Sequence, residues 1–359
     1  MAGPAPDEGA VLGRIETYRR RRPRLADDTV TLSHGAGGKA SAALVDAVFI
    51  EAFGAPDEAE LTDGAVLDVV AGRIAYSTDS YVVHPIRFPG GSIGDLAVNG
   101  TVNDLAVSGA VPRWLSAAFV IEEGLAVADL RAIAADMRTA ADAAGVAIVT
   151  GDTKVVPKGA ADKVFITTSG IGLVPDGRAL GAARVRVGDR LVLSGPIGAH
   201  GMAIMLARGD LDLEADIASD TAPLNHLVEA LYAAGVDVAW MRDATRGGLG
   251  TIANELSGAC GLGVVLDDET IPVDEAVRGA CDMLGIDPLY VANEGCFVAV
   301  VRPDDAARAV EVLRGAGATQ AALIGEIAAE PAGLVAIRNA FGGVRLVDML
   351  VGDPLPRIC

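Results

Sequence analysis

The spacing of apolar residues predicts helices and short strands that alternate along the whole chain. The clearest helix is residues 127–144, where Leu130, Ile133 and Met137 recur on one face. In the first half we also expect a helix at 41–53, an amphipathic segment at 93–108, a hairpin from 65–70 and 73–78, and strands at 29–32, 115–121, 146–150 (buried) and 164–171. The second half predicts strands at 190–194, 263–266, 297–301 and 322–327, and helices at 199–207, 223–233, 249–259, 273–284 and 304–316.

These elements favour an α+β fold of mixed α/β layers, because helices and strands alternate but short strand pairs also occur. The turn residues at 174–177 mark a break, so we expect an N-terminal domain at 29–180 and a C-terminal domain at 181–345. Residues 1–28 form an arginine-rich extension that we expect to be disordered. This extension lacks the apolar stretch that a twin-arginine export signal would need.

The last segment, residues 346–359, predicts a flexible tail that ends in a cysteine. Pro354 and Pro356 disfavour a helix, so the tail should be extended. If residues 346–350 anchor on the body, a following segment of about ten residues reaches about 33–36 Å. Cys359 would then be a thiol at the tip of a swinging arm, and an ordinary frayed terminus is the alternative.

The composition of the chain argues against some classes of function. A net charge of −19 argues against nucleic-acid binding, because the phosphate backbone would be repelled. A nucleotide remains compatible, because a divalent cation can lie between carboxylates and phosphates. No apolar run is long enough to span a membrane. Cys260, Cys281 and Cys296 lack the spacing of a zinc site or a dense disulfide framework, which predicts a cytoplasmic protein with reduced core thiols.

Five aspartates stand at the ends of apolar runs in polar or glycine-rich contexts: Asp63, Asp79, Asp104, Asp152 and Asp243. Any one of them alone is typical of a turn or a helix cap. Aspartates from several strand ends can also converge on Mg²⁺, which prefers oxygen ligands and bridges carboxylates to phosphates. The set therefore favours a magnesium–nucleotide site.

The glycine loop at residues 33–39 is not a Walker motif, because Ser33 replaces the first glycine and Ala40 replaces the hydroxyl residue. Its backbone amides can still bind an oxyanion, with Lys39 adding charge, or the loop is a plain turn. Lys154 follows Asp152 by two residues and shares a strand face with it, either as a surface ion pair or within a site. Glu294 precedes an apolar strand. It is either a turn residue or a general acid or base beside a site that excludes water.

A series of motifs carries a family resemblance. They are residues 33–39, 78–81, 100–106, 121–124, 150–154, 242–248 and 290–295, and the terminal Pro356-Arg357-Ile358-Cys359. In this order and these residue types they resemble the HypE family of hydrogenase-maturation proteins, over residues 29–359. The terminal motif is the most specific of them. Ser92 and Asp95 depart from the pattern that we expect in relatives.

The resemblance implies a two-domain architecture like that of AIR synthetase (PurM), in an ATP-using superfamily that includes selenophosphate synthetase. It implies a homodimer paired through strands of the first domain. A HypF-type carbamoyltransferase would place a carbamoyl group on Cys359, and ATP-dependent dehydration would convert this thiocarboxamide to a thiocyanate. The cyano group would pass to iron on a HypC–HypD complex, for the active centre of [NiFe] hydrogenase.

The resemblance also implies roles for individual residues. Cys359 would carry the substrate, Lys154 would orient the carbamoyl group and Glu294 would relay a proton. The residues implied in ATP binding are Gly35, Gly37, Gly38, Lys39, Asn103 and Thr153. The residues implied in Mg²⁺ binding are Asp79, Asp104, Asp152 and Asp243, with Asp63 a weaker candidate.

Two other functions fit part of the pattern. An ATP-dependent kinase or synthetase of the same superfamily, acting on a free small molecule, keeps the aspartates but gives Cys359 no role. A non-catalytic scaffold that delivers a modified thiol between partners keeps Cys359 but needs no ATP hydrolysis. Removing Cys359 separates the first alternative from the carrier hypothesis, and ATP turnover separates the second.

Overall fold

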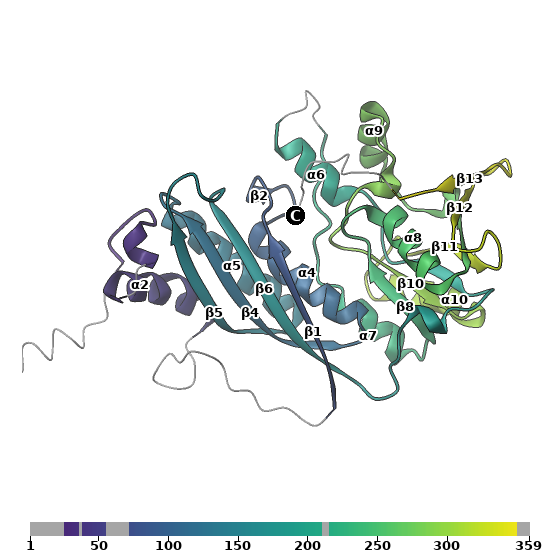
Figure 1. Ribbon diagram of the computed structural model, residues 1–359, viewed down its shortest axis with the longest axis horizontal. Helices are drawn as coiled ribbons and strands as arrows, with labels where there is room; N and C mark the ends of the chain where they lie inside the picture. Colours follow the sequence, from purple (N-terminus) through teal and green to yellow (C-terminus); the bar gives the residue numbers. More distant parts are fainter. Residues whose placement is uncertain (1–24, 36–37, 55–71, 210–214, 350–359) are drawn as a thin grey trace, which may run out of the picture.

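The computed structural model describes residues 25–35, 38–54, 72–209 and 215–349. Within these ranges the chain forms two main sheets with helices packed against them, and helix α4 (Ile93–Val107) lies between the two sheets (Figure 1). The predicted α+β fold of mixed layers is confirmed. None of the helices in the described ranges is long and apolar enough to cross a membrane. Residues 1–24, the first hairpin strand at 65–70, Gly37, Asp63 and Cys359 lie outside them.

The first sheet has the strand order β1-β6-β4-β5, in which only the β4–β5 pair is parallel. Its strands are β1 (Arg73–Tyr81), β6 (Val164–Val174), β4 (Val111–Glu122) and β5 (Ala147–Val156). The prediction that the strand starting near residue 146 is buried is wrong for β5, which has no buried residue. The reason is its position, because β5 is an edge strand and one face of this sheet is open.

Helix α5 (Val127–Ala144) begins and ends at the residues that its periodicity predicted. Gly145 ends it in the left-handed region with φ of 69°, a conformation that glycine adopts without strain. The helical segment predicted at 41–53 is α2 (Gly38–Leu44), a π-helical turn η2 (Val45–Ile50) and α3 (Glu51–Phe53). The predicted strand at 29–32 is reduced to one bridge, between Thr29 and Ala126, because Leu32 begins the 3-10 turn η1 (Leu32–Gly35).

Helix α4 is buried almost all round and is not the amphipathic helix that we expected. It contacts β1, β4 and β6 on one side and α7 and β8 on the other, so neither side faces solvent. Its N-terminus has a capping box, in which the Ser92 hydroxyl accepts from the backbone of Asp95 while Asp95 accepts from the backbone of Ser92. The departure from the family pattern at these two positions is thus compatible with a well-defined helix start.

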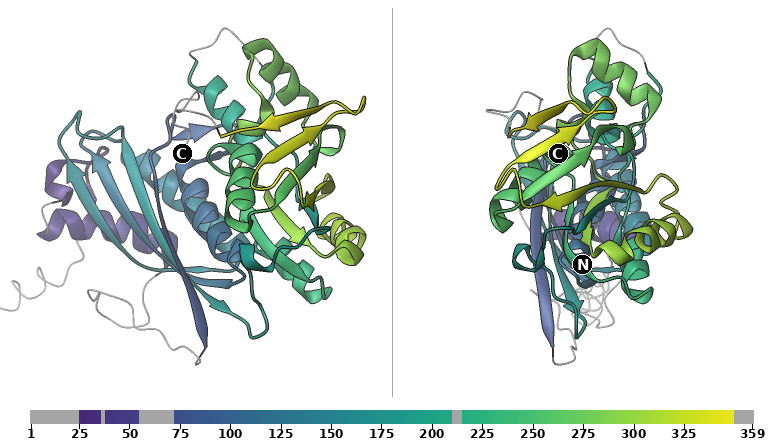
Figure 2. Two further views of the ribbon diagram at one scale, coloured as in Figure 1. Left: turned by 45° about the vertical axis from the view of Figure 1, so that its right-hand side comes forward. Right: turned by 90° about the vertical axis from the view of Figure 1, so that its right-hand side faces the viewer.

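The second sheet has the strand order β13-β12-β9-β11-β7-β10-β8. Its strands are β7 (Arg190–Leu193), β8 (Val238–Asp243), β9 (Gly263–Asp267), β10 (Phe297–Val301), β11 (Ala322–Ala328), β12 (Val335–Arg338) and β13 (Val344–Val347). The helices around it are α6 (Ala199–Ala207), α7 (Asn225–Ala233), α8 (Gly248–Cys260), α9 (Glu275–Leu284) and α10 (Ala306–Gly315). Strands β8, β12 and β13 were not predicted. Leu346 and Val347, which we placed in the tail, belong to β13, at the edge of this sheet (yellow in Figure 2).

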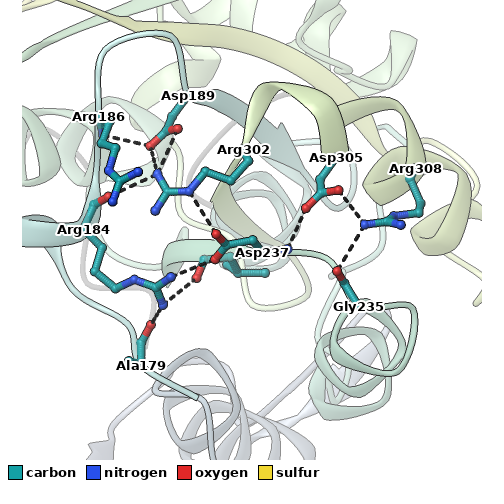
Figure 3. Close-up of polar contacts among 10 residues, drawn as sticks. Ala179, Arg184, Arg186, Asp189, Gly235, Asp237, Arg302, Asp305 and Arg308 are labelled. Atoms are coloured by element: carbon teal, nitrogen blue, oxygen red, sulfur yellow. Dashed lines mark hydrogen bonds and ion pairs between the residues drawn. The ribbon is translucent and has the colours of Figure 1, made fainter. Parts of the chain in front are cut away.

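A network of ion pairs, partly buried, lies at one end of strands β7, β10 and β8 in the second sheet (Figure 3). The Arg302 guanidinium, which follows β10, donates to the Asp189 carboxylate at 2.8 Å and to the Asp237 carboxylate at 3.0 Å. Asp189 precedes β7 and Asp237 precedes β8, so this arginine joins the ends of three neighbouring strands. The Asp189 side chain is only 3% exposed, and its charge therefore depends on Arg302 for compensation.

Candidate functional site

Two predicted metal ligands meet where α4 crosses β1. Alternation along β1 places Ser77 and Asp79 on the sheet face that α4 covers. The Ser77 hydroxyl donates to the Asp104 carboxylate on α4 at 2.6 Å. Burial raises the pKa of Asp104, and the nearby charge of Asp79 raises it further. These two carboxylates therefore lie close together although they are distant in sequence.

The second sheet supplies two more carboxylates at the same place. Asp243 ends β8 and pairs across the sheet with Phe297, the first residue of β10. Glu294 stands just before β10 in the chain, and both acidic residues are 5% exposed. Burial raises the pKa of Asp243 to about 7, and the charges of Asp104 and Asp79 contribute to this rise. Two carboxylates from each half of the chain therefore converge between the two sheets. We call this place the seam, and its acidic residues are Asp79, Asp104, Asp243 and Glu294.

The surroundings of Glu294 also shift its pKa. Burial raises its pKa well above the ordinary range, and Asp243 and Asp220 add to the effect. The charge of Arg242 counteracts the rise at Asp104 and Asp243. A buried carboxyl group with a raised pKa is suited to general acid–base catalysis, because its carboxylate is a stronger base than an exposed one.

The carboxylates at this place suit a divalent cation that brings other ligands with it. In the described ranges no group of three possible ligands is already arranged around a metal position. Mg²⁺ commonly binds one or two carboxylates and takes its other oxygens from phosphates and water. The negative charge gathered at the half-buried Asp79 and Asp104 and the buried Asp243 fits a cation that arrives with a nucleotide.

Asp152, Thr153 and Lys154 are not part of this cluster within one chain. They lie on β5, and Gly151 is in register with Asp79 across the two strands between them, which corresponds to about 14 Å. Asp152 and Lys154 point to the open face of the sheet, away from α4, and form an exposed ion pair at 2.8 Å. The prediction that Asp152 shares a metal with the other three aspartates is therefore not met within a single chain.

The side chain of Asn103 bridges the two halves of the protein. Its amide donates to the carbonyl oxygens of Ala222 and Glu294, at 3.1 and 3.3 Å, and its carbonyl accepts from the backbone of Leu224 at 2.8 Å. These contacts use both protons of the side-chain amide, so in this arrangement it has no proton left to donate to a nucleotide. The predicted role of Asn103 in ATP binding stays a prediction.

The chain is similar to known proteins in both of its halves. Residues 61–174 match the model of the AIR synthase related protein N-terminal domain, and residues 186–337 match that of the C-terminal domain. The carbamoyl dehydratase HypE of Rhodobacter capsulatus is 52% identical over 342 residues, covering 93% of this chain and 99% of the relative. The chain belongs to the HypE family.

Solved HypE structures have the same fold. A crystal structure of HypE in complex with ATP superposes with a TM-score of 0.87 at 46% identity, covering 92% of this chain and all of that one. A crystal structure of a HypE–HypF complex superposes with a TM-score of 0.75 at 46% identity, covering 77% of this chain and 90% of that one. The family resemblance and the AIR synthetase-like architecture that the sequence implied are both confirmed.

In this member of the HypE family the predicted glycine loop is divided between two helical elements. Gly35 ends η1, and Gly38 and Lys39 begin α2, while Gly37 is outside the described residues. Their contribution to ATP binding remains a prediction.

The sequence analysis missed Asp220, which lies between α6 and α7. Its carboxylate accepts hydrogen bonds from the backbone amides of Glu294 and Gly295, at 3.1 and 3.0 Å. Burial raises the pKa of Asp220 to about 6. An aspartate in a Ser-Asp-Thr context resembles any helix-start residue, so no local signal pointed to this role.

Proposed function

We propose that this protein uses ATP to dehydrate a carboxamide carried on its own Cys359, and that the product is a thiocyanate. The product would supply the cyanide ligand for the iron of [NiFe] hydrogenase during its maturation. Membership of the HypE family supports the reaction class. We assign Cys359 as the carrier of the substrate mainly from the place where the C-terminal tail begins.

The tail begins beside the loop that carries Glu294. The Tyr290 hydroxyl donates to the carbonyl of Asp348 at 2.8 Å, and Asn254 donates to the carbonyl of Val347 at 3.0 Å. Tyr290 precedes Glu294 by four residues, which is at most about 14 Å of chain. About eleven further residues separate Asp348 from Cys359, and in extended form they reach about 36 Å. A thiol at the end of such a tail has enough chain to enter the seam.

The proposed chemistry converts a poor leaving group into a good one. The carboxamide oxygen attacks the γ-phosphorus of ATP, and the bond from that phosphorus to the bridging oxygen breaks, which releases ADP. The nitrogen gives up one proton as the oxygen is phosphorylated and a second as the C–O bond breaks. Phosphate leaves with the former amide oxygen, and –S–C≡N remains. Phosphoryl transfer of this kind depends mainly on alignment and charge neutralisation.

We assign the roles within this reaction as follows. Glu294 accepts a proton from the carboxamide nitrogen, and its burial in the seam suits that task. Asp79, Asp104 and Asp243 would hold Mg²⁺, which supplies charge neutralisation at the phosphates when it is bound. Lys154 would orient the carboxamide. On β5, Asp152 lies beside Lys154 and stays a proposed Mg²⁺ ligand, and Thr153 between them is proposed to contact the nucleotide.

The role of Lys154 depends on a second copy of the chain, because this residue lies across the first sheet from Glu294. The open face of that sheet exposes apolar side chains, including Ile74 at 58% and Tyr76 at 65%, and we propose it as the homodimer interface. Mixing a Lys154→Met variant with a Glu294→Gln variant should then restore part of the activity that each lacks. No recovery after verified subunit exchange would place both residues in one chain's site or remove Lys154 from the reaction.

The proposed partners follow from the same reaction. A HypF-type carbamoyltransferase would load Cys359, and one solved relative is described as a HypE–HypF complex. A HypC–HypD complex would accept the cyano group. We place the reaction in the cytoplasm, where the thiols of Cys281 and Cys296 stay reduced in the core.

The decisive experiment is intact-mass analysis of the protein after incubation with an active carbamoyltransferase, carbamoyl phosphate and ATP–Mg²⁺. A carbamoyl adduct adds about 43 Da, and dehydration then removes about 18 Da. We expect the dehydrated species only with hydrolysable ATP, and neither species in Cys359→Ala. ATP turnover that persists in Cys359→Ala would support a synthetase of free small molecules. A carbamoyl adduct that never loses water would support the scaffold.

A further inference from the structure

The backbone of Glu294 is held at both of its polar atoms by side chains from other segments. Its amide donates to Asp220, and its carbonyl accepts from Asn103 of α4. The next amide, of Gly295, donates to the second oxygen of the same Asp220 carboxylate. We propose that Asp220 and Asn103 form a clamp that fixes Glu294 at the seam, and that both are positioning residues for the proposed dehydration.

The loop that carries Glu294 is closely packed against its neighbours. A Cβ atom added at Gly295 would lie 1.7 Å from the backbone oxygen of Asp220, so the two segments touch backbone to backbone. Asn293, which is fully buried, accepts from the amide of Gly198 at 2.6 Å and donates to the carbonyl of Ala244 at 2.7 Å. The residues on either side of Glu294 are therefore fixed as well, and its carboxyl group projects from a rigid base.

The clamp needs a carboxylate at position 220. Two neighbouring amides each require an acceptor, and the two oxygens of Asp220 satisfy one each. The amide of His200, in the first turn of α6, also donates to this carboxylate. An asparagine would offer one oxygen and would turn an NH₂ group toward a backbone N–H, which is a repulsive contact.

The clamp also connects the two halves of the chain. Asn103 lies on α4, one residue before Asp104, so the helix that presents one member of the acidic cluster also holds Glu294. The segment that carries Asp220 is tied to α4 at Thr221, whose hydroxyl accepts from Asn99 at 3.2 Å. A shift of α4 would therefore move Asp104 and Glu294 together, which keeps the geometry of the seam constant.

The proposal rests on the proposed function, and its test uses the full-length protein preloaded with a carbamoyl group on Cys359. We would measure the single-turnover rate of water loss by mass, and the KM for ATP, in Asp220→Asn and Asn103→Leu. In both variants the rate should fall by about 100-fold while KM changes by less than about threefold, because misplacing a reacting group mainly slows the chemical step. A nucleotide-binding role of Asn103 would instead raise KM.

Asp189→Asn is the matched control. Asp189 is also a buried carboxylate that accepts from a backbone amide, that of Arg186 at 2.8 Å, but it lies at the opposite end of β7 and β10 from Glu294. This control should lose stability and keep the wild-type rate at a temperature at which it remains folded. An equal loss of rate in the control would show that the effect is general destabilisation and would overturn the clamp.

Amide hydrogen exchange gives a second readout that does not depend on activity. In Asp220→Asn the amides of Glu294 and Gly295 should exchange at least about tenfold faster, whereas in Asp189→Asn they should keep the wild-type rate. Unchanged exchange, or water loss within about threefold of the wild-type rate in both clamp variants, would overturn the proposal. If Asp220→Asn does not fold, Asn103→Leu decides alone. If the wild-type protein shows no water loss, the proposed function is wrong, and exchange still decides whether the clamp exists.

Discussion

The buried carboxylate of Asp243 leads to a prediction about stability that can be worked out from the structure. Its pKa is raised from 3.8 to about 7, first by burial and then by the charge of Asp104. Each pKa unit corresponds to about 1.4 kcal/mol, so the fully ionised carboxylate destabilises the folded protein by about 4 kcal/mol. Replacing Asp243 with asparagine keeps the shape of the side chain and removes this charge.

The direction of the effect follows from proton binding. The unfolded chain loses this proton near pH 3.8 and the folded protein near pH 7, so between these values only the folded protein holds it. The free energy of unfolding therefore falls as pH rises, and the loss is complete above about pH 7. At pH 8 without divalent cations, Asp243→Asn should be more stable than the wild-type protein by up to about 4 kcal/mol, and the difference should shrink as pH is lowered.

Urea unfolding followed by circular dichroism, at pH 6 and pH 8 in EDTA, measures this difference. Adding Mg²⁺ and a non-hydrolysable ATP analogue should stabilise the wild-type protein more than the variant, because the cation compensates the charge that the variant lacks. The control is Asp142→Asn, which removes an exposed carboxylate paired with Arg138. A variant that is no more stable than the wild type at pH 8 in EDTA, or a control that behaves in the same way, would refute the reasoning.

Three further predictions concern other parts of the molecule. Arg302→Met should lower the free energy of unfolding by about 3 kcal/mol, because it leaves the buried Asp189 carboxylate uncompensated; a loss below about 1 kcal/mol in urea unfolding would contradict this. Tyr232→Phe should leave stability unchanged or raise it by about 1 kcal/mol, because the buried hydroxyl has no hydrogen-bond partner in the described part of the chain; clear destabilisation by calorimetry would refute this. Lys154→Met should change stability by less than about 0.5 kcal/mol, since its pair with Asp152 is exposed, yet slow water loss from the carbamoylated protein by about 100-fold; a normal rate would remove Lys154 from the mechanism.

Local sequence patterns were sufficient to predict elements whose start and stop signals lie close together in the chain. The bounds of α5 follow from its apolar periodicity, and Gly145 provides the stop signal. The motifs and the terminal cysteine were likewise sufficient for the family, because they are read directly from residue order. Strands β8, β12 and β13 escaped prediction, and length alone is not the reason, because β7 is as short as β12 and β13 and was predicted.

The tertiary structure decided which residues meet. The sequence singled out the aspartates as a set, but strand order placed Asp79 at one edge of the first sheet and Asp152 at the other. Alternation along the strands then turned these two carboxylates to opposite faces. The contacts of Asp220 with Glu294 join residues far apart in the chain, so no spacing rule relates them. The sequence by itself therefore determined the local elements, the family and the types of chemically active residue. Only long-range packing determined which carboxylates share the seam, because burial and mutual repulsion depend on distances in space.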